Sequence, residues 1–232
     1  MVEATTRRFS RGFIRVLVAL AILLLGAGLL YRFGRSLWHP LLVKATGGTS
    51  VAQRLAEIRA AHPDLAGLQA RRVEIACFKQ ERRVEVFIDG KPWRNFAIAA
   101  ASGQLGPKLR EGDRQVPEGL YVIDAVNPDS SYHLSLRVSY PNADDRARSA
   151  ALGIGDLGGD IYIHGKEASI GCIAIGDDAI EQVFYAVNLV DPHAVEVMIA
   201  PMDLRRTAAE LPEHQELYAK IRRRLEALPP AP

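Results

Sequence analysis

The chain has 232 residues, of which 48% are hydrophobic and 24% charged, so it has the length and composition of a globular protein with one or two domains. Seven of the 29 basic residues but only one of the 27 acidic residues lie at or before Lys44, and the remainder therefore carries a net charge of −4. A slightly acidic globular part argues against nucleic acid as a partner, because phosphate binding requires a concentrated basic surface.

The first 31 residues have the pattern of an exported protein. Four arginines precede an uncharged apolar run over residues 16–31, and no small-residue cleavage site follows that run. Extended back to residue 13, the run reaches the length of a membrane-spanning helix, and the arginines favour a cytoplasmic N-terminus. We expect a single transmembrane anchor with the domain outside the cytoplasm, and a cleaved signal sequence is the alternative.

Residues 32–69 are expected to form a linker followed by one helix. Ser50 is suited to the N-cap of a helix over residues 51–61, in which Leu55 and Ile58 fall on one face. Pro63 is expected to end this helix.

Strands dominate the predicted domain over residues 70–201. Alternating apolar residues predict strands over residues 71–78, 84–88, 95–101, 120–126, 132–138, 160–164 and 194–199, and Asp89-Gly90 predicts a tight turn. A helix is expected from Asp177 to Leu189, and the segment 202–232 is expected to hold an amphipathic helix over about 212–228. This order of elements predicts a mainly β fold, a mixed or antiparallel sheet sandwich with flanking helices.

The two cysteines, Cys77 and Cys172, are too few for a disulfide scaffold. Cys77 lies in an alternating stretch, where a small buried side chain is the ordinary role. The sequence alone leaves open whether the two cysteines form a disulfide bond with each other.

The informative segment runs from the predicted strand that ends at His164 to Cys172, eight residues later. A thiol with an ordinary pKa is mostly protonated at neutral pH, so a nucleophilic cysteine needs a base such as histidine beside it. Gly171 and Cys172 could supply backbone amides to an oxyanion, and Ser169 could hydrogen-bond within the loop or orient the base. A core histidine and a buried thiol would fit the same spacing equally well. No metal constellation and no cofactor motif accompany these residues, so no cofactor is expected.

Several motifs together resemble the L,D-transpeptidase (YkuD-domain) family, in particular its YafK-like branch. His164-Gly165, a short loop and Ser169-x-Gly171-Cys172 are similar to the family signature. Further matches lie upstream of it: Val116-Pro117-Glu118-Gly119-Leu120-Tyr121 is similar to the family's strand entry and stands in the expected order before the signature. The other matches are Gly106-Pro107-Lys108-x-Arg110-Glu111-Gly112-Asp113-x-Gln115, Asn127-Pro128-x-Ser130-x-Tyr132 and Ser139-Tyr140-Pro141-Asn142-Ala143-x-Asp145-Arg146.

The resemblance implies a YkuD-like fold and a cysteine acyltransferase that acts on peptidoglycan stem peptides. Cys172 would form an acyl-enzyme, His164 would act as general base and acid, and amides near Gly171 would bind the oxyanion. Arg110, Asp145 and Arg146 are the candidates for contacts with the charged stem peptide. The resemblance also implies a periplasmic domain on an inner-membrane anchor, and an acceptor that is a neighbouring stem, a wall-linked lipoprotein or water.

Two positions depart from the family pattern. Many members have Ser-His-Gly-Cys followed two residues later by Arg, whereas this chain has Ile170 and Ala174 at those positions. The missing cation leaves open whether an amine or water completes the reaction. Three hypotheses follow: a transpeptidase, a hydrolase that uses the same thiol, and a non-catalytic cell-wall binding module in which Cys172 is structural.

Overall fold

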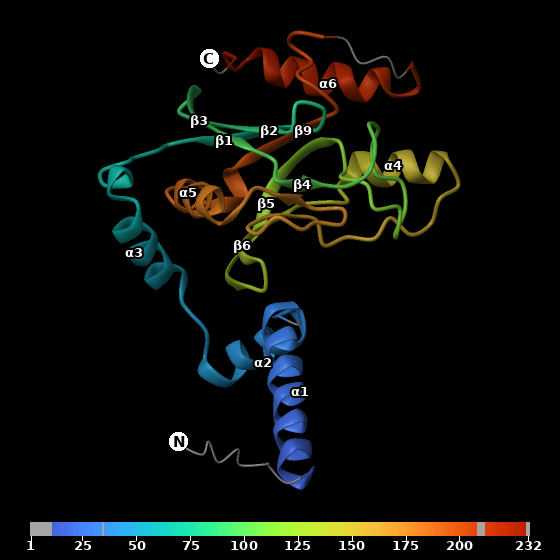
Figure 1. The fold of residues 1–232 in the computed structure, drawn as a ribbon. Helices are drawn as coiled ribbons and strands as arrows, with labels where there is room; N and C mark the ends of the chain where they lie inside the picture. Colours follow the sequence, from blue (N-terminus) through green and yellow to red (C-terminus); the bar gives the residue numbers. More distant parts are fainter. Residues whose placement is uncertain (1–10, 34, 208–211, 231–232) are drawn as a thin grey trace, which may run out of the picture. The chain divides into compact units, whose positions relative to one another are not determined.

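The computed structural model describes residues 11–33, 35–207 and 212–230, and the chain divides into two compact units, Met1–Gly48 and Thr49–Pro232 (Figure 1). The first unit contains α1 (Arg11–Phe33) and α2 (Arg35–Thr46). The segment expected to be a linker is thus largely helical, because Pro40 removes only one backbone donor while leucine and alanine favour a helix. Among the described residues, no helix combines the length and the hydropathy that are needed to cross a membrane.

The second unit is built on one curled sheet. Within the described residues the strand order is β3-β2-β1-β9-β5-β6-β7-β8-β4, with parallel pairing only between β1 and β9 and between β7 and β8. The strands are β1 (Val73–Phe78), β2 (Arg83–Ile88), β3 (Lys91–Ala97), β4 (Ala100–Ala101), β5 (Gly119–Ser130), β6 (His133–Val138), β7 (Tyr162–His164), β8 (Ile173–Ala174) and β9 (Glu196–Ala200).

The predicted mainly β class with mixed, mostly antiparallel pairing is confirmed, and the predicted sandwich takes the form of one curled sheet whose two parts share β5. Strand β5 is 12 residues long and joins both halves of the sheet. Its first residues, Gly119–Val122, pair with β9, and the part from Ile123 onward pairs with β6 through two register shifts. Such irregularities bend a strand and increase its twist, so the sheet curls without separating into two layers.

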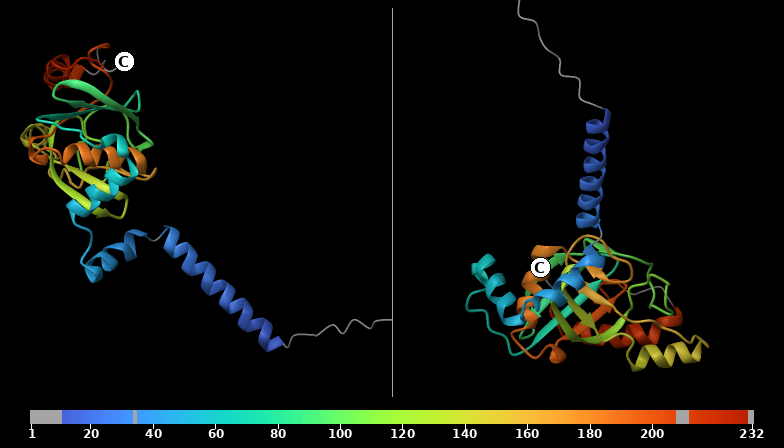
Figure 2. Two further views of the ribbon diagram at one scale, coloured as in Figure 1. Left: turned by 90° about the vertical axis from the view of Figure 1, so that its left-hand side faces the viewer. Right: turned by 90° about the horizontal axis from the view of Figure 1, so that it is seen from below.

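Helices cover both faces of the sheet around β1 and β9. Helix α5 (Asp177–Val187) lies on one face with α3 (Val51–Ala61), and α6 (Gln215–Glu226) lies on the other (Figures 1 and 2). Side chains alternate along a strand, so Ile75 and Cys77 join the core under α5 while Ala76 and Phe78 join the core under α6. Strand β1 is consequently buried along its whole length, and the predicted burial of Cys77 is confirmed.

The expected elements agree with the structure except at short or weakly periodic segments. Helix α3 has the predicted bounds, and Ser50 caps it in a capping box with Gln53. The predicted C-terminal helix begins with a 3-10 turn, Pro212–His214, and continues as α6. Helix α4 (Ala143–Ala151) and the two-residue strand β8 were not predicted.

We expect Asn142→Ala to lower the free energy of unfolding by about 1–2 kcal/mol, the usual cost of losing a helix N-cap. The Asn142 side chain accepts a hydrogen bond from the Asp145 amide and donates one to the carbonyl oxygen of Leu120 at 2.8 Å. Urea unfolding would measure the change. Asp144→Ala in the same turn is the control, because this exposed carboxylate pairs only at the surface with Lys220. Equal unfolding midpoints for the two variants would contradict the expectation.

Candidate active site

The pairing of β7 with β8 brings the predicted base and nucleophile to the same face of the sheet. These strands are parallel neighbours, with Ile163 opposite Ile173 and His164 opposite Ala174. Ile163 and Ile173 point into the core. Because side chains alternate, His164 and Cys172 point to the opposite face, and the loop over residues 165–172 brings both to the lining of one cavity.

A cavity of about 390 Å³ opens beside His164 and Cys172. The β5–β6 hairpin forms one wall and the loop before Cys172 forms another. None of the described lining residues is Asp, Glu, Lys or Arg, so the wall offers hydroxyl, amide and aromatic groups rather than fixed charges. The lining residues are Asn127, Ser130, Ser131, Tyr132, Ser135, Tyr162, His164, Ala168, Ser169, Ile170 and Cys172.

His164 is held as a neutral imidazole. Its Nδ1 lies 2.6 Å from the carbonyl oxygen of Gly165, so Nδ1 carries the proton and Nε2 is the free base. The ring of Tyr132 packs against it with a centroid separation of 4.6 Å. Burial lowers the pKa of His164 below its ordinary value of 6.5, and the Gly165 hydrogen bond opposes this effect only in part.

The Cys172 thiol is protonated at rest. Burial raises its pKa above the ordinary value, while the Tyr162 amide and the charge of Lys108 act in the opposite direction. The Sγ donates to the carbonyl oxygen of Asp160 at 3.5 Å. Asp160 has a positive φ of 55°, an uncommon conformation for a residue other than glycine. A protonated thiol and a neutral imidazole therefore line the same cavity at neutral pH.

These shifts predict the acid limb of the pH profile. Catalysis by His164 requires the neutral imidazole, and a lowered pKa keeps that form populated at more acid pH. We expect kcat/KM to fall only below pH 6.5, the ordinary value for histidine, when pH is decreased from neutrality. Turnover of a soluble stem peptide between pH 4 and pH 8 would measure the limb, and a midpoint above 6.5 would contradict the expectation.

The two amides expected to bind an oxyanion are both engaged in the resting structure. The Gly171 amide donates to Ser102 Oγ at 2.7 Å, and the Cys172 amide donates to Ser169 Oγ at 3.1 Å. Ser169 Oγ in turn donates to the Cys172 carbonyl oxygen at 2.7 Å, so Ser169 bonds within the loop rather than to the base. Gly171 has a φ of 85°, which explains why glycine stands there. An oxyanion at the Cys172 amide must first displace Ser169 Oγ.

The three predicted substrate contacts do not line this cavity. Arg110 and Arg146 are exposed elsewhere on the domain. Asp145 is buried in the first turn of α4, where its carboxylate accepts from the amide of the N-cap Asn142 at 3.0 Å, pairs with Arg148 at 3.1 Å and accepts from the hydroxyl of Tyr121 at 3.2 Å. These contacts stabilise the start of α4, and a contact of Asp145 with the stem peptide stays a prediction.

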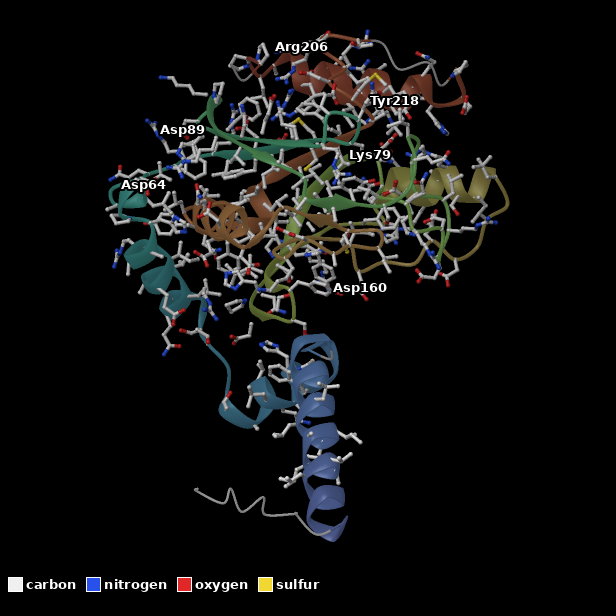
Figure 3. All side chains as sticks on the ribbon, in the orientation of Figure 1. Asp64, Lys79, Asp89, Asp160, Arg206 and Tyr218 are labelled. Carbon is white, nitrogen blue, oxygen red and sulfur yellow. The ribbon has the colours of Figure 1, made fainter. Side chains whose placement is uncertain are left out.

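Sequence reasoning missed the residues that reach the site from distant segments. Tyr132 and the hairpin serines lie in the matched Asn127–Tyr132 motif, which was a signal for them. The contact of Ser102 with Gly171 spans 69 residues and has no local signal. Asp160, labelled on the lower side of the domain in Figure 3, contributes its backbone carbonyl to the thiol, and a carbonyl has no sequence signature.

A buried ion pair fixes the loop that carries Ser102. Glu118 accepts hydrogen bonds from Lys79 at 2.9 Å, from the Gly106 amide at 2.8 Å and from the hydroxyl of Tyr218 at 2.8 Å. Figure 3 shows Lys79 and Tyr218 on the side of the sheet that α6 covers. A buried carboxylate with this many donors is fully satisfied, so α6 and the loop before β5 are held together.

Comparison with known proteins identifies the family of this domain. Residues 72–197 match the family model described as the L,D-transpeptidase catalytic domain, YkuD, which is more than half of the chain. The chain belongs to the L,D-transpeptidase catalytic-domain (YkuD) family. It is 34% identical over 152 residues to YafK of Escherichia coli K12, a candidate L,D-transpeptidase. The match covers 62% of this chain and 58% of that relative, so the chain spans well under two thirds of the relative's length.

Solved structures are similar over comparable stretches. The helical cell shape determining protein Pgp2 from Campylobacter jejuni is 25% identical with a TM-score of 0.45, covering 66% of this chain and 56% of that one. Bd1075 from Bdellovibrio bacteriovorus is 17% identical with a TM-score of 0.44, covering 67% and 56%. L,D-transpeptidase 1 from Mycobacterium tuberculosis is 16% identical with a TM-score of 0.35, covering 56% and 62%.

Proposed function

We propose that this protein is a cysteine acyltransferase of the L,D-transpeptidase type, which acts on peptidoglycan stem peptides through an acyl-enzyme on Cys172. The observation that carries the proposal is the placement of Cys172 and His164 on one face of β7 and β8, beside the cavity. Membership of the YkuD family supports the choice of substrate class.

In the first half of the reaction, the Cys172 thiol attacks the carbonyl carbon of a stem-peptide amide while His164 Nε2 accepts the thiol proton. The tetrahedral intermediate places its negative charge on the former carbonyl oxygen, near the Cys172 amide. As the carbon–nitrogen bond breaks, the imidazolium returns its proton to the leaving amine. In the second half, His164 removes a proton from an incoming amine or water, which attacks the thioester and releases the Cys172 thiol.

Product analysis on a defined muropeptide with a tetrapeptide stem tests the proposal. Loss of the terminal residue together with a cross-linked product supports a transpeptidase. A shortened monomer, or release of a lysine-linked protein from the wall, supports a hydrolase instead. Unchanged substrate after prolonged incubation would contradict both, and mass spectrometry separates these outcomes by the masses of the products.

The hydrolase is the second candidate, and the absence of charged groups from the cavity wall favours it. A donor that ends in a free carboxylate would need a cation in the cavity wall, whereas the described lining residues include no Lys or Arg, and Lys108, whose charge reaches Cys172, is paired with Asp113 at 2.6 Å. Ala174, opposite His164, is fully buried and leaves no space for one. An uncharged wall suits an internal amide, such as the link between a stem and a lipoprotein lysine, with water as the acceptor.

The third hypothesis, a binding module with a Cys77–Cys172 bridge, has less support. Both cysteines are free thiols in the structure, and burial raises the pKa of Cys77 to about 12. A thiol with that pKa is inert at neutral pH, so Cys77 is suited to packing and not to exchange.

We also propose that the N-terminal segment exports the domain to the periplasm, either as an inner-membrane anchor or as a cleaved signal. The proposal rests on the uncharged run over residues 16–31, on the arginines before it and on a substrate that lies outside the cytoplasm. Alkaline phosphatase fused after residue 232 should be active in cells. Replacement of Leu23 and Leu24 by Arg should abolish that activity, and activity that survives this change would contradict export through this segment.

A further inference from the structure

One carboxylate joins three elements on the side of the domain that carries the cavity. Glu181 on α5 accepts a hydrogen bond from His133 Nε2 at 2.7 Å through one oxygen. Its other oxygen accepts from His62 Nε2 at 2.8 Å. His62 directly follows α3 and His133 is the first residue of β6, so Glu181 links α5 to the end of α3 and to the tip of the β5–β6 hairpin.

The hairpin tip that Glu181 holds is in contact with the predicted base. Tyr132, next to His133, packs its ring against His164 at an angle of 46°. Behind the base there is no spare space, since a Cβ placed on Gly165 would lie 2.7 Å from the Tyr132 carbonyl oxygen and 3.0 Å from His133 Cβ. A shift of the tip would therefore move Tyr132 relative to the imidazole.

We propose that Glu181 is a positioning residue for the reaction: through His133 it holds Tyr132 against His164 and keeps the hairpin wall of the cavity in place. The role rests on the proposed function, because it concerns the orientation of the base in that chemistry. Misplacement of a catalytic group by about 1 Å costs up to about 100-fold in rate, so a modest shift of the tip has a measurable effect.

Other contacts hold the hairpin on either side of its tip. Arg54 on α3 donates to the carbonyl oxygen of Pro128 at 3.1 Å and pairs with Asp129 at 3.3 Å, near the end of β5. Along β6, the carbonyl oxygen of Leu134 accepts from the Gly165 amide at 3.2 Å, and Arg137 pairs with Asp124 at 2.7 Å. Removal of Glu181 therefore releases the side chain of His133 at the start of β6, next to Tyr132, while the rest of the hairpin stays attached.

The charged groups around Glu181 identify a matched control. Asp178, one turn earlier on α5, lies 4.0 Å from His62 Nε2 and is 82% exposed. Asp177 and Lys166 form a separate pair at the start of α5. Asp178→Asn removes a carboxylate from the same helix beside the same histidine, but leaves the contact between Glu181 and His133 intact.

The experiment measures the pKa of His164 by NMR titration of its ring, together with kcat/KM, in the full chain. For Glu181→Ala we expect the pKa of His164 to rise toward 6.5 as the ring becomes more exposed, and kcat/KM to fall about tenfold. Glu181→Gln should restore both values, because its amide can accept from one imidazole and donate to the other. Asp178→Asn should match the parent.

A double variant separates positioning from a general loss of stability. If Glu181 acts through Tyr132, then Glu181→Ala should change kcat/KM by less than about twofold in a Tyr132→Ala background. Full additivity of the two effects, or an unchanged pKa of His164 in Glu181→Ala, would overturn the proposal. Should Glu181→Ala fail to fold, His133→Asn removes the same contact and keeps a residue that tolerates the φ of 74° at this position.

The same measurements distinguish failure of this inference from failure of the proposed function. If the parent does not turn over stem peptide, the proposed function is wrong. The NMR titration and the rate of Cys172 alkylation by iodoacetamide still report whether Glu181 controls the surroundings of His164.

Discussion

Cys172→Ala should reduce turnover of a stem peptide by at least about 1,000-fold, because Cys172 is the one thiol among the described residues of the cavity and the proposed acyl-enzyme forms on it. The remaining rate would come from binding and polarisation of the amide alone. Intact-mass spectrometry with substrate should show an acyl adduct on the parent protein and none on the variant. Circular dichroism would verify that the variant is folded, since a partly exposed side chain shortened by one atom leaves no core cavity.

Cys77→Ala is the matched control for this prediction. Both variants remove one sulfur. Cys77, however, is completely buried in β1, a strand whose residues are all buried. We expect it to retain the parent kcat/KM and to lose about 1 kcal/mol of stability through the cavity it leaves. Turnover by Cys172→Ala at the parent rate would rule out the thiol mechanism, whatever the behaviour of Cys77→Ala.

Much of the fold could be predicted because its elements have strong local signals. Ser50, the apolar face of α3 and Pro63 define one helix through capping and periodicity alone. The alternation in Val73–Phe78 marks a strand, although both of its faces are buried by helices that come much later in the chain. Local patterns identify a helix or a strand well when its capping residues and the spacing of its apolar side chains follow the regular period of that element.

The curl of the sheet and the details of the site depend on contacts that no local pattern records. The sheet curls because β5 pairs first with β9, which lies about 75 residues later in the chain, and then with its hairpin partner β6. Cys172 and His164 were found from their chemistry, whereas the Asp160 carbonyl and the Ser102 hydroxyl were not. Asp145 shows the converse, since a charged residue chosen from a matched motif for its charge lies buried as the capping-box partner of Asn142.

Gly165→Ala should lower kcat by about 100-fold while the protein stays folded, because the substitution acts on the base through its immediate support. Gly165 has no positive φ, so the effect is steric and not conformational. The added Cβ would lie 2.6 Å from Asp177 Oδ1 and 2.7 Å from the Tyr132 carbonyl oxygen, closer than real Cβ atoms approach any neighbour. Overpacking of this kind costs about 1–3 kcal/mol, which a domain of this size can tolerate.

Gly165 is hydrogen-bonded both to His164 and to the β5–β6 hairpin, so any movement that accommodates the new Cβ also affects the base. Its carbonyl oxygen accepts from His164 Nδ1 and fixes the tautomer, and its amide donates to the Leu134 carbonyl oxygen at 3.2 Å. A shift that relieves the clash therefore either breaks the hydrogen bond to His164 or displaces the hairpin tip that carries Tyr132. Both changes disturb the imidazole, so kcat should fall more than the affinity for substrate.

Gly155→Ala is the control, because a Cβ there meets nothing within 4 Å and the backbone has no positive φ. It should leave kcat and the unfolding midpoint at the parent values. For Gly165→Ala, single-turnover acylation of Cys172 should slow as much as steady-state turnover, since the base is needed in the first step. If acylation keeps the parent rate in Gly165→Ala, then His164 does not depend on the hairpin for its orientation, and the tight packing behind it serves stability alone.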